Sequence, residues 1–228
     1  VALATACREA KAEKVTVKGS DTMVITAQKW AEVYQKSRPQ ISIQVTGGGS
    51  GVGIASLING TTDIANASRP IKKSEIDNAR ANGVYPFEVK SALDGLAVVV
   101  GKNNPVKEMT VKVVAGIFTG AVNNWKELGG PDHEIVRYCR ESSSGTYVFF
   151  KEDVMKNKDY AADCQTLQGT AAIAEAVAKD PFGIGYGGIA YFEGRSDLKI
   201  LPIAPEKGKP AIDPMNPGGK GVNYQVIY

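Results

Sequence analysis

Short strand-like runs alternate with helix-like runs along most of this 228-residue chain, and that alternation limits the folds open to it. Residues 41–45 alternate apolar and polar side chains as a half-buried strand does, and residues 24–36 place apolar side chains along one helical face. Residues 96–100 form an apolar run typical of a buried strand. The pattern predicts an α/β fold with largely parallel sheets, in which ligands bind beyond the carboxyl ends of the strands.

Two loops that combine hydroxyl groups, glycines and an arginine lie where a strand-like run gives way to a helix-like run. Residues 46–53 read TGGGSGVG and are followed by NASRP at 66–70, while residues 140–146 read RESSSGT. A helix N-terminus offers unpaired N–H groups to an anion, glycines let the backbone approach it, and hydroxyls and arginine donate directional hydrogen bonds. The sequence therefore predicts one small oxyanion held between two lobes. The candidate ligands from these loops are Ser50, Gly51, Arg69, Arg140, Ser144, Gly145 and Thr146.

A third loop of the same style adds Ser20, Asp21 and Thr22. A carboxylate repels a bare anion, but it accepts a hydrogen bond from the P–OH group of hydrogen phosphate, a donor that sulfate lacks. We therefore expect Asp21 to select protonated phosphate over sulfate. Alternatively, Asp21 is a helix cap that points away from the ligand. Arg69 either holds Asp21 ionised or contacts the anion directly.

The sequence lacks the motifs of nucleotide binding and of common hydrolytic chemistry. Residues 47–53 contain no G-x-G-x-x-G spacing, and Ile54 stands where a phosphate-binding P-loop needs lysine. Val52 replaces the last glycine of a nucleophile elbow around Ser50, and His133 lies in a turn. With one histidine and no Cys-x-x-Cys spacing, we expect no metal, no cofactor and no enzymatic activity.

The net charge and residues 1–7 bear on the partners and the cellular location of the protein. The net charge of +3 is too small to indicate a nucleic-acid partner, and no apolar run is long enough to span a bilayer. Residues 1–7 are mostly small and apolar and end in Cys7, as the end of an export signal does. We expect a periplasmic or otherwise extracytoplasmic protein, either anchored through a lipid on Cys7 or without an anchor. The alternative for this segment is a frayed terminus or an expression remnant.

Several motifs, in family order, make the chain resemble the phosphate-binding proteins that serve ABC-type phosphate transporters, which are periplasmic-binding-protein-like. The resemblance covers most of residues 14–190, and its most specific motifs are the GGGSG loop and the R-x-x-x-S-G-T element. Other matching stretches are GSDTM at 19–23, DIANASRP at 63–70, LDGL at 93–96, IFTG at 117–120 and GTAA at 169–172.

The resemblance implies a type II-like, two-lobed periplasmic-binding-protein fold, with a mixed, mostly parallel sheet flanked by helices in each lobe and a hinge between the lobes. It implies a monomer that binds inorganic phosphate and delivers it to the membrane permease of an ABC transporter. The alternatives are the same fold binding sulfate or molybdate, and a phosphate-ester hydrolase. The implied phosphate ligands are Ser20, Thr22, Ser50, Arg140, Ser144, Gly145 and Thr146.

Two features depart from the family. Some members carry an aspartate where this chain has Arg69, so Asp21 becomes the expected acceptor for the proton of the ligand. Relatives usually continue into a further strand and helix, whereas residues 214–228 read as an unusual ending, so we expect a first lobe that is incomplete or completed by something else. The predicted division is a tail at 1–13, a first lobe at 14–95 and 188–228, a second lobe at 96–187, and a hinge near Gly95 and Gly187.

Cys139 and Cys164 lie near the end of one predicted strand and the start of the next. If these strands are parallel neighbours, the two residues are offset along the strand axis, beyond the reach of a disulfide. An exported protein nevertheless permits a bridge, so both outcomes stay open.

Overall fold

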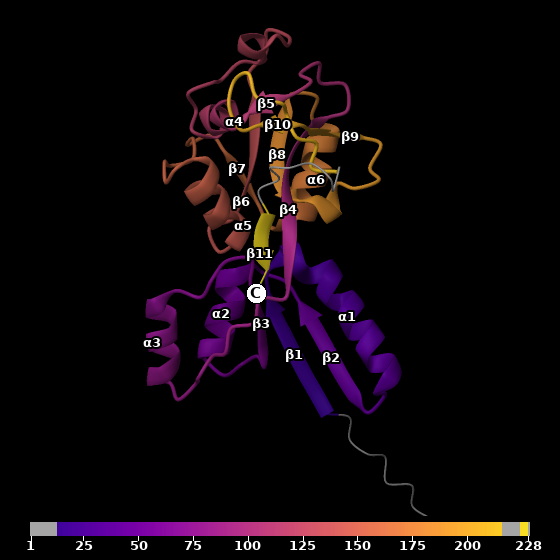
Figure 1. Cartoon of the computed structure of the whole chain (residues 1–228), viewed down its shortest axis with the longest axis vertical. Helices are drawn as coiled ribbons and strands as arrows, with labels where there is room; N and C mark the ends of the chain where they lie inside the picture. The colour runs from indigo at the N-terminus through magenta and orange to yellow at the C-terminus, as the bar shows by residue number, and fades with distance from the viewer. Residues whose placement is uncertain (1–12, 216–223, 228) are drawn as a thin grey trace, which may run out of the picture.

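The computed structural model describes residues 13–215 and 224–227, and it forms two lobes, each built around its own main sheet (Figure 1). The predictions for residues 1–7, lipid attachment at Cys7 included, lie outside the described residues.

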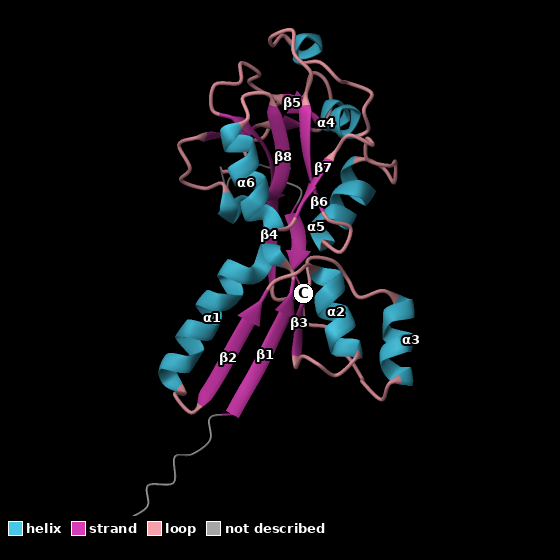
Figure 2. Ribbon diagram, turned by 180° about the vertical axis from the view of Figure 1, so that it is seen from behind, coloured by secondary structure: helices cyan, strands magenta, loops and turns pink. Residues whose placement is uncertain are grey.

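The first lobe is a three-stranded parallel sheet in the order β2-β1-β3. Since all three strands run in the same direction, the loops that follow them meet at one edge of the sheet, which faces the second lobe (Figure 2). This arrangement is what the alternating pattern predicts. The elements are β1 (Glu13–Gly19), α1 (Val24–Ser37), β2 (Ile41–Thr46), α2 (Ser50–Ile58), β3 (Ile64–Asn66) and α3 (Lys73–Ala81).

The second lobe contains a mixed sheet in the order β11-β4-β8-β6-β7, with β9 also paired to β4. β6 runs parallel to β7 and β8, whereas β4 is antiparallel to β8, β9 and β11. The strands are β4 (Ala92–Gly101), β6 (Val136–Arg140), β7 (Gln165–Leu167), β8 (Gly183–Gly188), β9 (Leu198–Leu201) and β11 (Tyr224–Ile227), beside a two-stranded pair of β5 (Met109–Thr110) and β10 (Ile203–Ala204). The helices are α4 (Val111–Phe118), α5 (Gly145–Phe149), which continues into a π-helical turn, and α6 (Gly169–Lys179).

β4 separates the two apolar clusters that stabilise the second lobe. Val98 and Val100 point into the larger cluster, which includes Trp125, while Ala97 and Val99 point into the cluster under α6. This alternation follows from the two-residue period of a strand and explains why residues 96–100 are almost continuously apolar. The sheet of the second lobe is therefore packed on both faces, which fixes the positions of the loops at its edge.

The predicted division returns the chain to the first lobe after Gly187, but the next two strands of the structure, β9 and β10, lie in the second lobe. β9 pairs with β4, and β10 pairs with β5, so residues 198–204 belong to the second lobe. The predicted division gives residues 200–203 to the first lobe, but Leu201 and Ile203 pack in the larger apolar cluster of the second lobe, and Ile200 packs against the cluster under α6. β11 is the next described strand, and it pairs with residues 92–95 at the start of β4.

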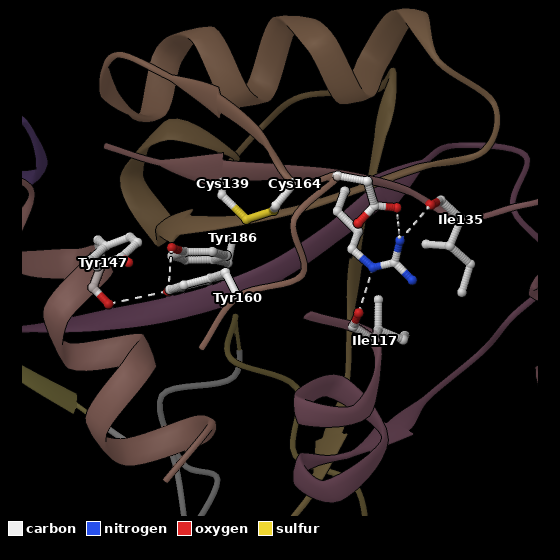
Figure 3. Close-up of a disulfide and its surroundings, with 9 residues drawn as sticks. Ile117, Ile135, Cys139, Tyr147, Tyr160, Cys164 and Tyr186 are labelled. Carbon is white, nitrogen blue, oxygen red and sulfur yellow. Dashed lines mark hydrogen bonds and ion pairs between the residues drawn. A yellow bond between two sulfur atoms is a disulfide. The ribbon is translucent and has the colours of Figure 1, made fainter. Parts of the chain in front are cut away.

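Cys139 and Cys164 form a disulfide, with their Cα atoms 5.9 Å apart (Figure 3). The expectation that strand offset would separate them is wrong because both strands are short. Tyr138 pairs with Gln165 in the register of β6 and β7, so Cys164 lies only two positions from the level of Cys139. The bridge ties the edge strand β7 to β6.

Candidate functional site

Three serine hydroxyls of the first lobe converge at the carboxyl edge of its sheet. Ser20 follows β1, Ser50 begins α2, and Ser68 lies just after β3. Ser20 Oγ donates to Ser68 Oγ at 3.0 Å, and the hydroxyl oxygens of Ser50 and Ser68 lie 3.2 Å apart. The Ser68 N–H donates to Ser50 Oγ at 3.0 Å, and all three side chains are buried. We call Ser20, Ser50 and Ser68 the serine cluster.

The glycine loop between β2 and α2 needs its glycines. Gly48 and Gly49 have φ angles of 117° and 92°, in the region that disfavours any residue with a Cβ atom. Gly53 packs directly on β1, where a Cβ atom would overlap the carbonyl oxygen of Lys18. The loop therefore delivers Ser50 to the serine cluster at the start of a helix that lies close against the sheet.

The RESSSGT loop of the second lobe closes against the serine cluster. A Cβ atom on Gly145 would overlap Ser50 Oγ and would lie 2.6 Å from Ser68 Oγ. The hydroxyl oxygens of Thr22 and Thr146 lie 2.6 Å apart across the lobes. Ser144 Oγ accepts from the Tyr147 N–H at 3.2 Å as the N-cap of α5, and the Gly51 N–H donates to the carbonyl of Ser143 at 2.9 Å. These contacts unite both predicted loops at one place.

Arg140 is fully buried at the end of β6, and its guanidinium is surrounded by polar partners. Nη2 donates to Asp21 Oδ2 at 3.0 Å and to Glu141 Oε1 at 2.9 Å, and Nε donates to Glu141 Oε2 at 3.1 Å. Nη1 donates to the hydroxyl of Thr170 at 2.9 Å. The Asp21 contact joins the two lobes, so Arg140 stands at their junction beside the serine cluster.

Asp21 is neither a helix cap turned outward nor a partner of Arg69. Its Oδ1 accepts from the Gly48 N–H at 3.0 Å, and its Oδ2 accepts from Arg140. The Tyr191 hydroxyl donates to its backbone oxygen at 2.5 Å. Asp21 thus holds both the glycine loop and the guanidinium of Arg140, which is a positioning role that the sequence did not predict.

Arg69 is the one predicted site residue that the structure pairs elsewhere. Its Nη1 and Nη2 donate to the two carboxylate oxygens of Glu75 at 2.9 and 2.7 Å, and Nη1 also donates to the carbonyl of Pro70 at 2.9 Å. This bidentate pair anchors the chain that leads from β3 into α3. The expectation that Arg69 holds Asp21 ionised is wrong, because Arg140 occupies that place.

Sequence reasoning missed several polar residues of this region. Ser68 precedes Arg69 in the NASRP motif. The arginine is the stronger anion ligand, so the motif predicted Arg69 as a site residue and not Ser68. Thr170 and Glu141 complete the shell around Arg140. Since Glu141 is adjacent to Arg140 in the sequence, its charge was a usable signal, whereas the contact with Thr170 depends on the packing of α6 on the sheet.

Other features of the described residues do not suggest a second polar site. Within residues 13–215 and 224–227, no three His, Cys, Asp or Glu side chains are grouped so that they would hold a metal. A cavity of about 130 Å³ in the second lobe is lined by apolar side chains such as Val114 and Phe150, which offer an anion no donors. Among the described helices, none has the length and apolar character needed to cross a bilayer.

A family model described as the PBP superfamily domain matches residues 4–224. The chain belongs to this superfamily. A candidate phosphate ABC transporter substrate-binding protein from Clostridium perfringens, solved with bound phosphate, is 32% identical and superposes with a TM-score of 0.77, covering 85% of this chain and 76% of that chain. The predicted two-lobed periplasmic-binding-protein fold and the resemblance to phosphate-binding proteins are confirmed.

Curated relatives share the similarity over most of this chain. Phosphate-binding protein PstS of Staphylococcus haemolyticus is 36% identical over 205 residues, which cover 88% of this chain and 63% of that protein. Protein SphX of Synechococcus elongatus is 35% identical over 211 residues, which cover 89% of this chain and 63% of that protein. The chain therefore spans less than two thirds of the length of these relatives.

Proposed function

We propose that this chain binds inorganic phosphate between its two lobes, at the serine cluster and the loop of residues 140–146. The observation that carries the proposal is the convergence of three hydroxyls from separate loops of the first lobe with Gly145 and Arg140 of the second lobe. A buried tetrahedral oxyanion needs hydrogen-bond donors such as hydroxyls, a guanidinium and backbone N–H groups, and a glycine lets the anion approach the backbone. The implied ligands are Ser20, Thr22, Ser50, Gly51, Arg140, Ser144, Gly145 and Thr146.

The relatives extend the proposal from binding to transport. Proteins similar to this chain are named phosphate-binding proteins, and one of them is described as an ABC transporter substrate-binding protein. We infer that the chain takes up phosphate outside the cytoplasm as a monomer and passes it to the permease of an ABC transporter, without catalysing a reaction. The mechanism is closure of the two lobes over the anion, about the segment in which β4 begins.

The proposal is tested by titrating phosphate, sulfate and molybdate into protein stripped of bound anions, with heat as the readout. We expect one phosphate per chain and much weaker binding of sulfate, by a factor on the order of 10⁴, because a site that uses the ligand's proton rejects an analogue without it. Equal affinities for phosphate and sulfate would favour a general oxyanion receptor. Steady hydrolysis of a phosphate monoester, lost in Ser50→Ala, would favour a hydrolase.

A further inference from the structure

Two tyrosine hydroxyls in the second lobe are hydrogen-bonded to each other and to the backbone beside the loop of residues 140–146. The hydroxyl oxygens of Tyr160 and Tyr186 lie 2.7 Å apart, and Tyr160 donates to the carbonyl of Tyr147 at 3.2 Å (Figure 3). A phenol has one proton to donate. Since Tyr160 gives its proton to Tyr147, Tyr186 donates to Tyr160. We call Tyr160 and Tyr186 the tyrosine pair.

Tyr186 also reaches the first residue of this loop. Burial raises the pKa of its hydroxyl, whereas the Tyr160 hydroxyl, a hydrogen bond from the Arg140 backbone N–H and the charge of Arg140 oppose that rise. Burial raises the pKa of the Tyr160 hydroxyl as well. Both phenols therefore keep their protons at neutral pH, and the pair contacts the backbone of Arg140 at one end of the loop and of Tyr147 just past the other.

Tyr147 connects the tyrosine pair with an implied ligand of the anion. Its N–H donates to Ser144 Oγ at 3.2 Å, while its carbonyl accepts from Tyr160. Ser144 is thus held through Tyr147, and Arg140 is held through its own backbone N–H. The two hydroxyls therefore link both ends of the loop that carries three implied phosphate ligands beside Arg140, namely Ser144, Gly145 and Thr146.

Ring packing fixes the orientation of both phenols. The ring of Phe150 stacks on that of Tyr186 with the centroids 3.8 Å apart and an interplanar angle of 12°. The ring of Tyr147 stacks on that of Tyr160 at 4.6 Å and 24°. Tyr147 and Phe150 belong to α5 and to the π-helical turn that continues it. The helix that begins at the loop therefore packs on the rings of the tyrosine pair.

The disulfide joins the same two segments of the chain. Cys139 directly precedes Arg140 at the end of β6, and Cys164 follows Tyr160 by four residues. Figure 3 shows the bridge beside both tyrosines. The bridge ties the segment that carries Tyr160 to the strand that carries Arg140, so the tyrosine pair keeps its place relative to the loop.

We propose that Tyr160 and Tyr186 are positioning residues of the anion site, whose hydroxyls hold the two ends of the loop of residues 140–146 at the spacing that the anion needs. The inference rests on the proposed function and refines it. Both rings pack in the larger apolar cluster, where phenylalanine would fill nearly the same space, so packing alone does not require two hydroxyls there. Donors that are held in place before the anion arrives lower the ordering cost of binding.

The test compares phosphate affinities of the wild-type chain, Tyr160→Phe and Tyr186→Phe by calorimetric titration. Each variant keeps its ring but leaves a polar partner of the lost hydroxyl unsatisfied, so phosphate binding should weaken roughly 5- to 100-fold. The double variant should bind about as weakly as Tyr186→Phe, because the two hydroxyls act together. Tyr138→Phe is the matched control. The Tyr138 hydroxyl donates at 2.9 Å to Asp180, just past the end of α6, and its removal should leave affinity unchanged.

Amide exchange in the anion-free protein gives a readout that a merely structural role would not produce. In Tyr160→Phe and Tyr186→Phe, residues 142–147 should exchange faster than in the wild type, while β4 and α6 keep their protection. Loss of protection across the whole second lobe would mean that the hydroxyls only stabilise the fold, and it would overturn the proposal. Wild-type affinity in both variants, or equal weakening in Tyr138→Phe, would also overturn it. If the wild-type chain binds no phosphate, the proposed function fails, and exchange at residues 142–147 still decides whether the tyrosine pair positions the loop.

Discussion

Replacing Arg140 with alanine is expected to weaken phosphate binding by about 2–5 kcal/mol, or roughly 30- to 5,000-fold. Arg140 is buried at the junction of the lobes, where its guanidinium contacts Asp21, the neighbour of Ser20 in the serine cluster. Its removal eliminates a charged donor to the anion and leaves Asp21 and Glu141 as uncompensated negative charges. Both effects act against an anion, and calorimetric titration measures their sum.

Arg140→Lys and Arg195→Ala accompany this variant. Lysine retains the charge but lacks the planar fork that reaches Asp21, Glu141 and Thr170 together, so we expect an intermediate affinity. Arg195 pairs with Glu175 and Asp197 at the surface, and its replacement should leave affinity unchanged. Urea unfolding of each variant separates loss of the site from loss of the fold. Full affinity in a folded Arg140→Ala protein would remove Arg140 from the site.

Gly145→Ala is expected to weaken phosphate binding by about 1–3 kcal/mol, or roughly 5- to 150-fold, while the chain remains folded. The added methyl group would overlap Ser50 Oγ and would lie 2.6 Å from Ser68 Oγ. Both neighbours belong to the first lobe, whereas Gly145 belongs to the second. The methyl group therefore opposes approach of the lobes without disturbing the core of either lobe.

Gly116→Ala is the matched control for this effect. Gly116 lies in α4, and the one atom within 4 Å of its new Cβ would be Cγ2 of Val122 at 3.2 Å, which belongs to the same lobe. We expect wild-type affinity from this variant. If Gly145→Ala binds phosphate as tightly as Gly116→Ala does, close approach of the two loops is not part of binding.

Local sequence patterns were sufficient to predict the lobed α/β fold and most of the loops. The regular alternation at 41–45 became β2, and the apolar run at 96–100 became the central part of β4. The glycine and hydroxyl motifs led to Ser50, Arg140 and their neighbours, because strand ends of parallel sheets meet at one edge. These features depend on periodicity and on short-range chemistry, which a sequence displays directly.

Pairings between distant segments could not be obtained in the same way. The disulfide depended on strand lengths that vary by one or two residues, and β9 joined β4 although residues 200–203 read equally well as a strand of either lobe. Arg69 and Arg140 are chemically equivalent candidates for Asp21, and only packing brings Arg140 to it and Glu75 to Arg69. The competing partners differ in their position in space and not in their chemistry.

The central claim is that one anion is held by loops of both lobes at once, and amide hydrogen exchange tests it most directly. Exchange is compared in protein without anions and at saturating phosphate. We predict that residues 47–53 of the first lobe and 142–147 of the second gain protection together, because the anion and lobe closure order both loops. Protection of only one loop would contradict a phosphate site between the lobes. Protection confined to other segments, such as α4 beside the apolar cavity, would contradict it as well.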